Sequence, residues 1–291
     1  MRIKTSLVAL TSILFFGVNA QNVQETFKGT RIINGHSIET LKKNTLQFRI
    51  EHRFGDMIPD LDLSNLTQSW FGFDQASDIR FALEYGITNK LMIGVGRSKG
   101  SGEPYRSLID GFVKYRVLTQ DKLSKVPLSI TLVGSSTISY MKASPDITQV
   151  QHFPKFTHRL AYSLQFNVAR KFGKQFSMAL IPAYIHRNYV DDDDVNGLFA
   201  LGSAFSLKLS KEMRVITEYY YTFHNSTVRS TNFNSLSAGL EYSKNGYNFK
   251  LILTNSKGFN ETQFIPGTYS DWLNGEFRLG FSLTRNIKLG E

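Results

Sequence analysis

Apolar and polar residues alternate along most of this chain after residue 44. In residues 45–54 (TLQFRIEHRF), every second side chain from Leu46 to Phe54 is apolar or aromatic, and those between them, from Gln47 to Arg53, are charged or polar. Successive side chains of a β-strand point to opposite faces, so this period of two predicts a strand with one apolar and one polar face. No helical period appears later in the chain, and the predicted fold class is therefore all-β.

The same alternation recurs eleven more times, and the connections between the segments alternate in length. The further segments are approximately 77–85, 91–97, 107–117, 128–140, 157–169, 175–187, 198–208, 214–223, 234–242, 248–255 and 276–284. Short turns follow the even-numbered segments, and longer connections follow the odd-numbered ones. This layout predicts a closed up-and-down antiparallel transmembrane β-barrel of about twelve strands, with short periplasmic turns and longer extracellular loops.

The composition of the two strand faces favours a membrane around the predicted barrel. A bilayer offers no hydrogen-bond partner to an open sheet edge, so only a closed barrel satisfies every backbone group there. The apolar faces carry Leu, Ile, Val, Phe and Tyr, whereas the polar faces combine small residues with too few charges to coat a soluble surface. Alternation alone does not decide which face points inward, and a soluble barrel with an apolar interior is the alternative.

The start of the chain is typical of a secretory signal peptide. Arg2 and Lys4 precede the short apolar stretch 6–18, and small residues before Gln21 suit cleavage by a signal peptidase. The stretch is shorter than a membrane-spanning helix requires. We therefore divide the chain into a signal peptide at 1–20, an N-terminal periplasmic segment at 21–44 and an outer-membrane β-barrel at 45–291, exported in a Gram-negative cell.

The charge of the chain is strongly basic. It carries 34 Lys and Arg against 24 Asp and Glu, a formal net charge of +10. Basic proteins often bind nucleic acid, but no run of basic residues marks a binding arm, and we expect no nucleic acid partner. The expected partners are outer-membrane lipid and lipopolysaccharide, the barrel-assembly machinery and, if the barrel conducts, small solutes. The chain has no cysteine, which excludes disulfides and thiolate metal sites, and no cofactor is expected.

Several stretches of the sequence are similar to one known family. Residues 27–55, 74–98 and 110–118 resemble an uncharacterised outer-membrane β-barrel family of Gram-negative bacteria, a domain of unknown function. The later stretches IPAYIHRNYV and ITEYYYTF are also similar to strands of that family. The resemblance implies an outer-membrane barrel over nearly the whole mature chain, but no activity, cofactor or catalytic residue. The chain departs from many outer-membrane barrels in ending with NIKLGE rather than an aromatic residue.

The polar strand faces supply the main candidate binding site. If they line the lumen, they place nine basic and five acidic residues there, a surplus of +4. These candidate lumen charges are Arg49, Glu51, Arg53, Arg80, Glu84, Asp110, Lys114, Arg116, Lys208, Arg214, Glu218, Glu241, Lys250 and Arg278. A basic lumen favours anions, and the first functional hypothesis is a passive or selective pore for small, anionic-biased solutes. A packed, ion-paired lumen is the competing interpretation, and plugging by 55–76 or 256–275 is compatible with either.

Four consecutive aspartates invite a metal interpretation. Asp191, Asp192, Asp193 and Asp194 lie within NYVDDDDVNG, between two predicted strands and on the long-loop side. An EF-hand-type calcium loop needs alternating oxygen ligands and a glutamate at its twelfth position, and here an apolar run occupies the later positions. The four residues are therefore a weak candidate for a loose divalent cation contact, and no other metal site is predicted.

No catalytic residues are predicted, and the chain is not expected to be an enzyme. His52, His158 and His186 share the apolar strand face near the long-loop ends, as an interfacial belt would. A surface lipid hydrolase of the outer-membrane phospholipase type remains a minor alternative, although no G-x-S-x-G stands near these histidines. The main alternative to the pore is a non-conducting structural or surface-binding barrel that acts through its extracellular loops.

Overall fold

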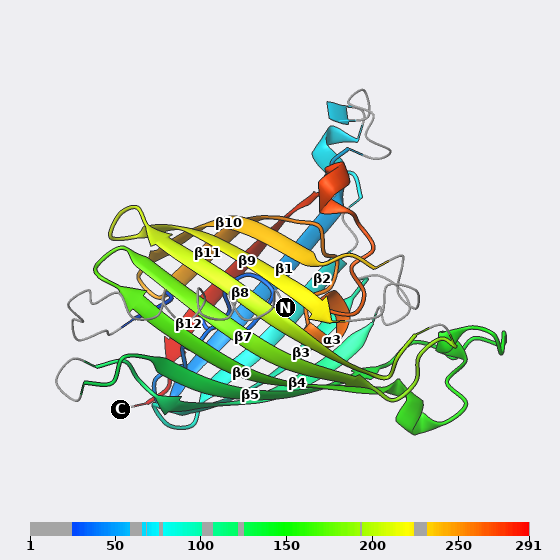
Figure 1. Cartoon of the computed structure of the whole chain (residues 1–291), viewed down its shortest axis with the longest axis horizontal. Helices are drawn as coiled ribbons and strands as arrows, with labels where there is room; N and C mark the ends of the chain where they lie inside the picture. The colour runs from blue at the N-terminus through cyan, green and yellow to red at the C-terminus, as the bar shows by residue number, and fades with distance from the viewer. Residues whose placement is uncertain are drawn as a thin grey trace, which may run out of the picture.

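Twelve strands form one closed antiparallel barrel in the computed structural model, which describes residues 25–58, 66–67, 69–75, 78–100, 107–121, 125–192, 194–223 and 232–290 (Figure 1). Each strand pairs with its neighbours in sequence, and β1 pairs with β12 to close the sheet. The strands are β1 (Thr45–Asp56), β2 (Asp78–Gly86), β3 (Leu91–Lys99), β4 (Leu108–Leu118), β5 (Ser129–Ser139), β6 (Leu160–Phe172), β7 (Phe176–Arg187), β8 (Gly197–Lys208), β9 (Met213–Phe223), β10 (Ser235–Lys244), β11 (Tyr247–Thr254) and β12 (Arg278–Lys288). The predicted all-β, up-and-down barrel of twelve strands is confirmed.

The strand boundaries differ most from the prediction at β12, which ends at Lys288 rather than at 284, and at β6. The alternation predicts a strand over 157–169, whereas β6 runs from Leu160 to Phe172. The reason is local, because Phe156–Arg159 forms the 3-10 turn η5 before the extended backbone begins at Leu160. Long connections leave one end of the barrel and short turns leave the other, so we call these ends the loop side and the turn side (Figure 1).

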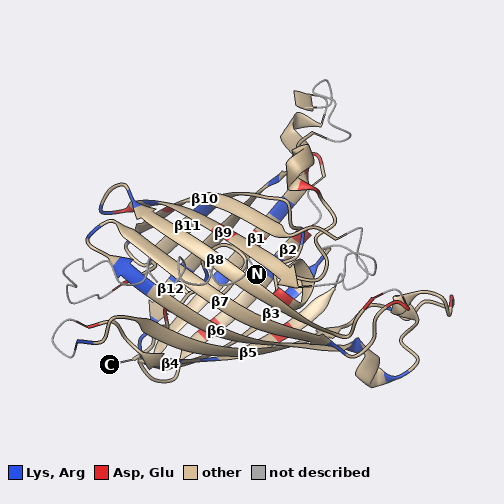
Figure 2. Ribbon diagram, viewed as in Figure 1, with Lys and Arg blue, Asp and Glu red and all other residues tan. Residues whose placement is uncertain are grey.

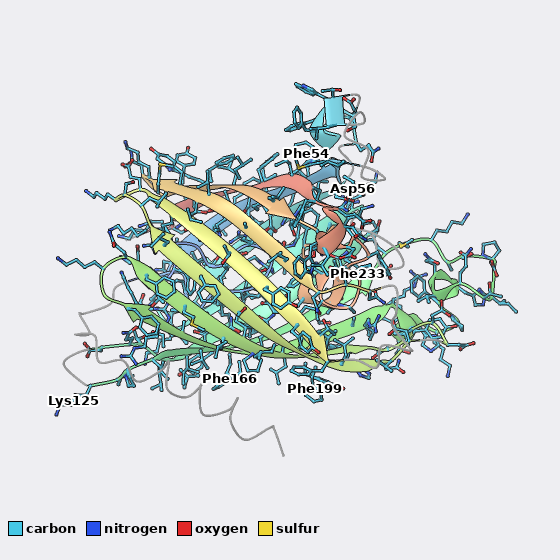
Figure 3. The ribbon with its side chains drawn as sticks, turned by 45° about the horizontal axis from the view of Figure 1, so that its top comes forward. Phe54, Asp56, Lys125, Phe166, Phe199 and Phe233 are labelled. Atoms are coloured by element: carbon cyan, nitrogen blue, oxygen red, sulfur yellow. The ribbon has the colours of Figure 1, made fainter. Side chains whose placement is uncertain are left out.

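The apolar strand face points outward, and the polar face points inward. Phe166 and Phe199 lie on the outer surface of the wall (Figure 3), and Phe199 is 63% exposed. The alternate residues on the same strands, such as Gln165 and Ala200, are buried inside. Most wall charges accordingly lie inside the barrel or at its two rims (Figure 2). No helix within the described ranges is both long enough and apolar enough to cross a membrane.

The chain before β1 folds into the barrel as a hairpin. The Ile32 amide donates to the Gly35 carbonyl at 2.9 Å, and the Ser37 amide donates to the Thr30 carbonyl at 3.0 Å. Both arms of this N-terminal hairpin, which we define as residues 25–44, extend from the turn side, where Asn44 bonds to the Gly86 carbonyl. Its tip is buried in the middle of the lumen.

The position of the hairpin corrects the predicted periplasmic segment. Residues 21–44 were expected to lie outside the barrel, but residues 26–39 are almost entirely buried within it, with Lys28 at its turn-side rim. A twelve-stranded wall encloses more space than its own inward side chains fill, and the hairpin occupies this space. The predicted signal peptide at 1–20 lies outside the described residues and stays a prediction.

A second segment enters the lumen from the loop side. Residues 255–268, which we call the inner loop, follow β11 and contain the one-turn helix α3 (Glu261–Phe264). The inner loop is buried, and α3 contacts β6 and β7 across the barrel from its own strands. Of the two candidate plugs, 55–76 and 256–275, the second therefore does occupy the lumen. In the first candidate, 55–76, the side chain of Trp70 is 63% exposed.

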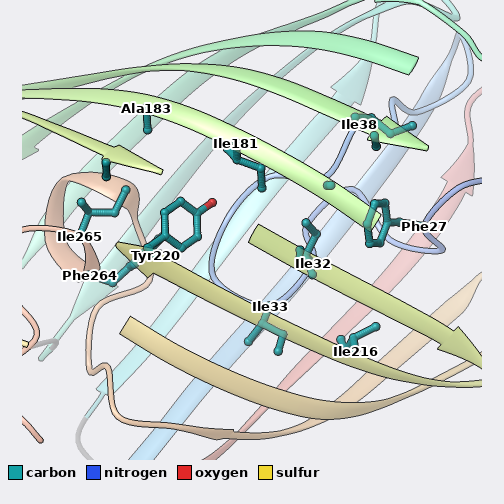
Figure 4. Packing of buried hydrophobic residues seen from close by; sticks show 14 of the residues in the cluster. Phe27, Ile32, Ile33, Ile38, Ile181, Ala183, Ile216, Tyr220, Phe264 and Ile265 are labelled. Atoms are coloured by element: carbon teal, nitrogen blue, oxygen red, sulfur yellow. The ribbon is translucent and has the colours of Figure 1, made fainter. Parts of the chain in front are cut away.

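The hairpin and the inner loop share an apolar core with one half of the wall. Phe27, Ile32, Ile33 and Ile38 of the hairpin belong to one buried cluster with Phe264 and Ile265 of the inner loop (Figure 4). The wall contributes small or apolar inward residues to this cluster, mainly from β6 to β9: Ala169, Ala179, Ile181, Ala183, Ile185, Leu198, Ala200, Ala204, Ile216 and Tyr220. The inward charges lie mostly on the other strands, so the lumen has an apolar half and a charged half.

Two leucine variants test the outward assignment of the apolar face. Leu251 lies mid-strand in β11 and is 47% exposed, whereas Leu289 follows the end of β12 and is 44% exposed. We expect Leu251→Arg to lower the free energy of unfolding by about 2–4 kcal/mol, because its charge meets the bilayer centre. Leu289→Arg should cost about 1 kcal/mol or less near the interface. Urea titrations of the protein in lipid vesicles measure both, and equal costs would contradict a membrane-spanning wall.

Candidate functional site in the barrel lumen

A chain of alternating charges crosses the wall of the charged half. The Arg80 guanidinium bridges two carboxylates, with N–O distances of 2.6 Å to Glu51 and 2.6 Å to Asp110. Arg49 lies between Glu51 at 3.9 Å and Glu84 at 3.0 Å. β1 and β2 are neighbours in the sheet, and β3 separates β2 from β4. Arg80 reaches Asp110 across β3 because position 96 there is glycine, where a Cβ would lie 2.6 Å from the Arg80 guanidinium. All five charged side chains are buried, so each charge depends on its neighbours for compensation.

Wall side chains satisfy the carbonyl groups of the hairpin. The Lys114 ammonium donates to the Thr30 carbonyl at 2.7 Å. The Lys250 ammonium donates to the carbonyls of Arg31 and Ile32, at 2.5 and 2.7 Å. A hairpin inside a barrel has no sheet partner for these carbonyls, and buried carbonyls without a partner are costly. The inward lysines thus compensate the hairpin backbone, and the hairpin provides ligands for the two buried ammonium groups.

Glu218 of β9 holds the tip of the hairpin. Its carboxylate accepts the backbone N–H groups of Ile33, Asn34 and Gly35, all at 3.1–3.2 Å. Hydrogen bonds to an ionised acceptor are stronger than neutral ones. Position 35 requires glycine for space, because a Cβ there would lie 2.1 Å from the Tyr220 hydroxyl. The tip sequence and the wall therefore fit one another at a single depth in the lumen.

Further wall residues bind the returning arm of the hairpin. Arg116 of β4 donates to the Glu39 carboxylate at 2.7 Å and to the Ile38 carbonyl at 3.2 Å. The Thr131 hydroxyl donates to the same carbonyl at 2.9 Å. Asn167 of β6 donates to the His36 carbonyl at 2.6 Å. Contacts to this arm thus come from three strands, which fixes the hairpin laterally as well as in depth.

The hairpin and the inner loop meet in the middle of the lumen. The Arg31 guanidinium lies 3.6 Å from the Glu261 carboxylate, and the His36 ring lies 3.9 Å from the same carboxylate. The inner loop is held to the wall as well, since the hydroxyls of Thr262 and Thr137 are 3.0 Å apart. The two segments therefore close the lumen jointly, from opposite ends.

The surroundings of the His36 imidazole disfavour its charged form. Burial lowers its pKa well below the ordinary value, and the positive charges of Arg31, Lys114, Arg49 and Arg80 lower the pKa further. The Glu261 carboxylate lies near the ring and is also close to Arg31. Neither ring nitrogen makes a hydrogen bond to the described protein. Protonation of His36 would therefore disfavour the buried position of the hairpin.

The remaining candidate charges also contact protein rather than an open channel. Glu241 lies 3.5 Å from Lys250, and Arg278 pairs with Asp56 near the loop side. Arg53 donates to the Asn34 side chain at 2.7 Å, and Arg214 reaches the Thr26 carbonyl at 3.4 Å. Lys208 is half-buried. The expectation of a water-lined pore therefore does not describe this state, because the hairpin and the inner loop occupy the space that the charges were predicted to line.

Sequence reasoning missed the lumen residues that do not belong to the wall. Arg31, His36 and Glu39 come from the N-terminal hairpin, and Glu261 comes from the inner loop. One signal was present in the sequence. Residues 26–41 (TFKGTRIINGHSIETL) contain five large apolar residues, which is unusual for a segment exposed to water.

A cavity of about 720 Å³ opens above the inner loop. Three long connections line it, with Lys142 and Gln149 before β6, Asp191 and Asp194 before β8, and Tyr269 before β12. A smaller cavity of about 210 Å³ lies at the turn side and shares no lining residue with it. The lumen is thus hollow at its ends and filled between them.

The aspartate run lies at the rim of the larger cavity. Asp194 forms an ion pair with Arg187 at 2.8 Å, and Asp191 and Asp192 are exposed. Asp193 lies outside the described residues. Within the described ranges, no group of three or more His, Asp or Glu side chains is arranged to hold a metal ion. The predicted loose cation contact therefore gains no support from the described residues.

The histidines of the outer belt contact aromatic rings. His52 stacks on Phe281 with 5.6 Å between ring centroids, and His158 stacks on Tyr189 at 4.5 Å. A serine hydrolase needs a hydroxyl within hydrogen-bond distance of a histidine, and no such pair occurs within the described ranges. The hydrolase alternative is left without a site to support it.

Together, the barrel and its filled interior define a membrane β-barrel whose lumen is closed by its own chain. A family model described as a membrane bound beta barrel domain (DUF5777) matches residues 27–287. The chain belongs to this family, as the resemblance in the sequence indicates. None of the curated proteins matches the chain.

Several solved structures have a similar backbone fold. The NanC porin covers 84% of this chain with 100% of its own, at 10% identity and a TM-score of 0.48. The KdgM porin in complex with disordered oligogalacturonate covers 83% of this chain with 98% of its own, at 9% identity and a TM-score of 0.49. LpxR from Salmonella typhimurium covers 83% with 99% of its own, at 10% identity and a TM-score of 0.39. Similarities this distant carry no argument about function.

Removal of Arg80 tests the buried charge network. Arg80→Met leaves Glu51 and Asp110 buried without their shared cation, and we expect the free energy of unfolding to fall by about 3–5 kcal/mol. The triple variant Arg80→Met, Glu51→Gln, Asp110→Asn should recover most of this loss, since no unpaired charge remains. Lys99→Met, at an exposed outward position, should change it by about 0.5 kcal/mol or less. Unfolding titrations in vesicles test all three, and a stable Arg80→Met barrel would refute the network.

Proposed function

We propose that this protein is an outer-membrane channel for small, preferentially anionic solutes, closed at rest by its N-terminal hairpin. One observation carries the proposal: the hairpin fills the lumen through non-covalent polar contacts, and both its arms lead back to the turn-side opening. No barrel strand has to separate for the hairpin to withdraw. Closure and opening therefore require movement of one short segment within an intact barrel.

Several contacts at the hairpin are incomplete, which supports a removable plug. The ring of His36, the hydroxyl of Tyr220 and the amide of Gln165 are buried and make no hydrogen bond to the described protein. A buried polar group without a partner costs about 1–3 kcal/mol, and this cost is relieved when water reaches the group. The hairpin is thus held by strong contacts at its tip and opposed by unsatisfied groups beside it.

The charge of the wall supports an anionic preference for the open state. The candidate lumen charges comprise nine basic and five acidic residues. The inward rows of the described strands also hold Asp78, Lys171 and Arg187, so the surplus of basic residues remains. The described hairpin holds four basic residues, Lys28, Arg31, Lys42 and Lys43, against Glu25 and Glu39, and its withdrawal leaves the charges of the wall itself unchanged. A basic lumen lowers the electrostatic barrier for anions and raises it for cations.

Placement in the outer membrane is part of the same proposal. It is supported by the signal-like start of the sequence, by the family's description as membrane bound and by the long connections on one side of the barrel. This topology is typical of outer-membrane barrels, with long loops outside the cell.

Planar-bilayer recordings of Glu218→Gln test the channel. The substitution removes the negative charge that accepts three N–H groups of the hairpin tip, and it points an amide toward those donors. We expect the wild type to be closed almost all the time and the variant to be open about ten times more often, since hydrogen bonds to charged groups contribute about 1.5–3 kcal/mol. Glu212→Gln, at the turn-side rim, is the matched control and should behave as the wild type.

Deletion of residues 26–39 provides a second arm of this experiment. It should give long openings with anion selectivity in a salt gradient. If both variants fold, as shown by heat-modifiable migration on a gel, and both stay silent, the channel proposal fails. Cation-selective openings would contradict the basic-lumen argument.

A disulfide tests which of the two inner segments moves. The chain has no cysteine of its own, and the hydroxyls of Thr137 and Thr262 are only 3.0 Å apart. Thr137→Cys with Thr262→Cys should tie the inner loop to β5 in the Glu218→Gln background. If the hairpin is the gate, the openings persist with the disulfide formed. Their loss on oxidation and return on reduction would assign the gate to the inner loop.

Channel opening should also depend on pH through His36. Its pKa is lowered in the closed state and returns to about 6.5 when the hairpin is released into water. The released state therefore binds the proton more readily, so closure is fully stable above about pH 6.5 and weakens as the pH falls below it. We expect several-fold more openings at pH 5 than at pH 7.5. His36→Gln should reduce this dependence, and His152→Gln in a loop should not.

A second candidate function is a non-conducting barrel that binds ligands through its loops. The observation that favours it is the cavity of about 720 Å³ among the long connections. The recordings above separate the two functions. If the Glu218→Gln barrel and the hairpin-deleted barrel fold but never conduct, the result favours ligand binding in the loop-side cavity.

A further inference from the structure

The outer wall contains an apolar groove of about 820 Å³ across β3, β4, β5 and β6. The sheet register explains its shape. Val95 pairs with Gly111, Gly111 pairs with Ser136, and Ser136 pairs with Tyr162, so these four outward positions form one row. In the next row toward the turn side, Val113 pairs with Gly134. Residues with little or no side chain thus form the floor, and Val95 and Tyr162 stand at its sides.

Three basic residues lie at the loop-side end of the same strands. Arg97 occupies the outward row above the groove, beside Ile109, and the exposed Lys99 follows two residues later. Arg159 precedes β6, and its Nη1 donates to the Met141 carbonyl at 2.6 Å, which places it at the end of β5. None of the three forms an ion pair with a carboxylate in the described part of the chain. The groove is therefore apolar along its length and positively charged at one end.

We propose that this groove binds a phosphorylated glycolipid of the leaflet that surrounds the long loops. One acyl chain would lie over Gly111, Gly134 and Ser136, and a headgroup phosphate would contact Arg97, Lys99 and Arg159. The choice of a glycolipid rests on the outer-membrane placement proposed above, but not on conduction.

The chemistry at both ends of the groove fits this occupant. An outward guanidinium is tolerated only where it reaches the headgroup region, and Arg97 lies near a strand end with its guanidinium 4.8 Å from the Tyr140 ring centroid. Clustered basic side chains at that level attract anionic headgroups. A flat β-wall contacts acyl chains only at its surface, whereas the missing side chains at Gly111 and Gly134 let a chain settle between neighbouring side chains.

The opposite rim offers a matched arginine–tyrosine pair away from this groove. Arg285 of β12 lies over the Tyr247 ring, 4.0 Å from its centroid, as Arg97 lies over Tyr140. Arg285 is at the turn side and donates to the Asn245 carbonyl at 2.6 Å. It therefore serves as a control for the removal of an outward arginine.

Native mass spectrometry of the full-length barrel in detergent tests the proposal, with bisphosphorylated lipid A, phosphatidylglycerol and phosphatidylcholine as probes. We expect one lipid A to bind at least ten-fold more tightly than either phospholipid. Arg97→Gln with Lys99→Gln should weaken lipid A binding about ten-fold. Gly134→Leu should weaken it several-fold by filling the groove. A Cβ at position 134 meets no atom within 4 Å, so this variant should fold normally. Arg285→Gln should bind as the wild type.

Three outcomes would overturn the proposal. Equal binding of phosphatidylglycerol and lipid A would show that the surface recognises negative charge and not a glycolipid. Unchanged binding by Gly134→Leu would remove the groove from the site. Loss of binding in Arg285→Gln equal to that in the Arg97 and Lys99 variant would show a non-specific charge effect. Each result is independent of conductance, so failure of this site and failure of the channel can be told apart.

Discussion

The structure depends on how buried charges inside the barrel are compensated. A wall of twelve strands with a polar inner face encloses lysines, arginines and carboxylates away from bulk water, and a buried charge without a partner is strongly destabilising. The strands supply part of the compensation themselves, as in the chain from Glu84 to Asp110 through Arg49 and Arg80. The hairpin supplies the rest: its carbonyls accept from Lys114 and Lys250, and its amides donate to Glu218. The wall and the hairpin therefore complete one another.

The two halves of the lumen explain why this particular segment fits. The wall from β6 to β9 presents alanines and branched apolar residues, and the hairpin places its isoleucines and Phe27 in the same cluster. The charged half meets polar hairpin residues such as Thr30, which accepts hydrogen bonds from Arg49 and donates to Glu84. The hairpin thus presents apolar side chains to one half of the lumen and polar groups to the other. The binding energy is thus divided between apolar burial, which resists water entry, and charged hydrogen bonds, which fix the depth of the tip.

This division has consequences for movement. A plug held only by apolar contacts would leave an apolar wall exposed to water when it withdrew. Here half of the exposed wall would be charged and readily hydrated, which lowers the cost of the open state. The inner loop connects two barrel strands, β11 and β12, whereas the described hairpin is connected to one, β1. The hairpin is therefore the less constrained of the two segments that close the lumen.

Sequence reasoning and the structure agree where the physics is local and periodic. Alternation from Thr45 onward is enough to predict twelve strands, their antiparallel order and which residues share a face, because side chains of a strand alternate regardless of what surrounds it. The fourteen candidate charges all lie on inner-face positions for that reason. The contents of the lumen could not be predicted in this way. Residues 26–39 carry no strand period, and their burial depends on contacts with residues far along the chain, such as Glu218. The closed state, the meeting of Arg31 with Glu261 and the row from Val95 to Tyr162 all arise from strand register and chain packing in three dimensions. An alternating pattern specifies which way each side chain points, but not what it meets.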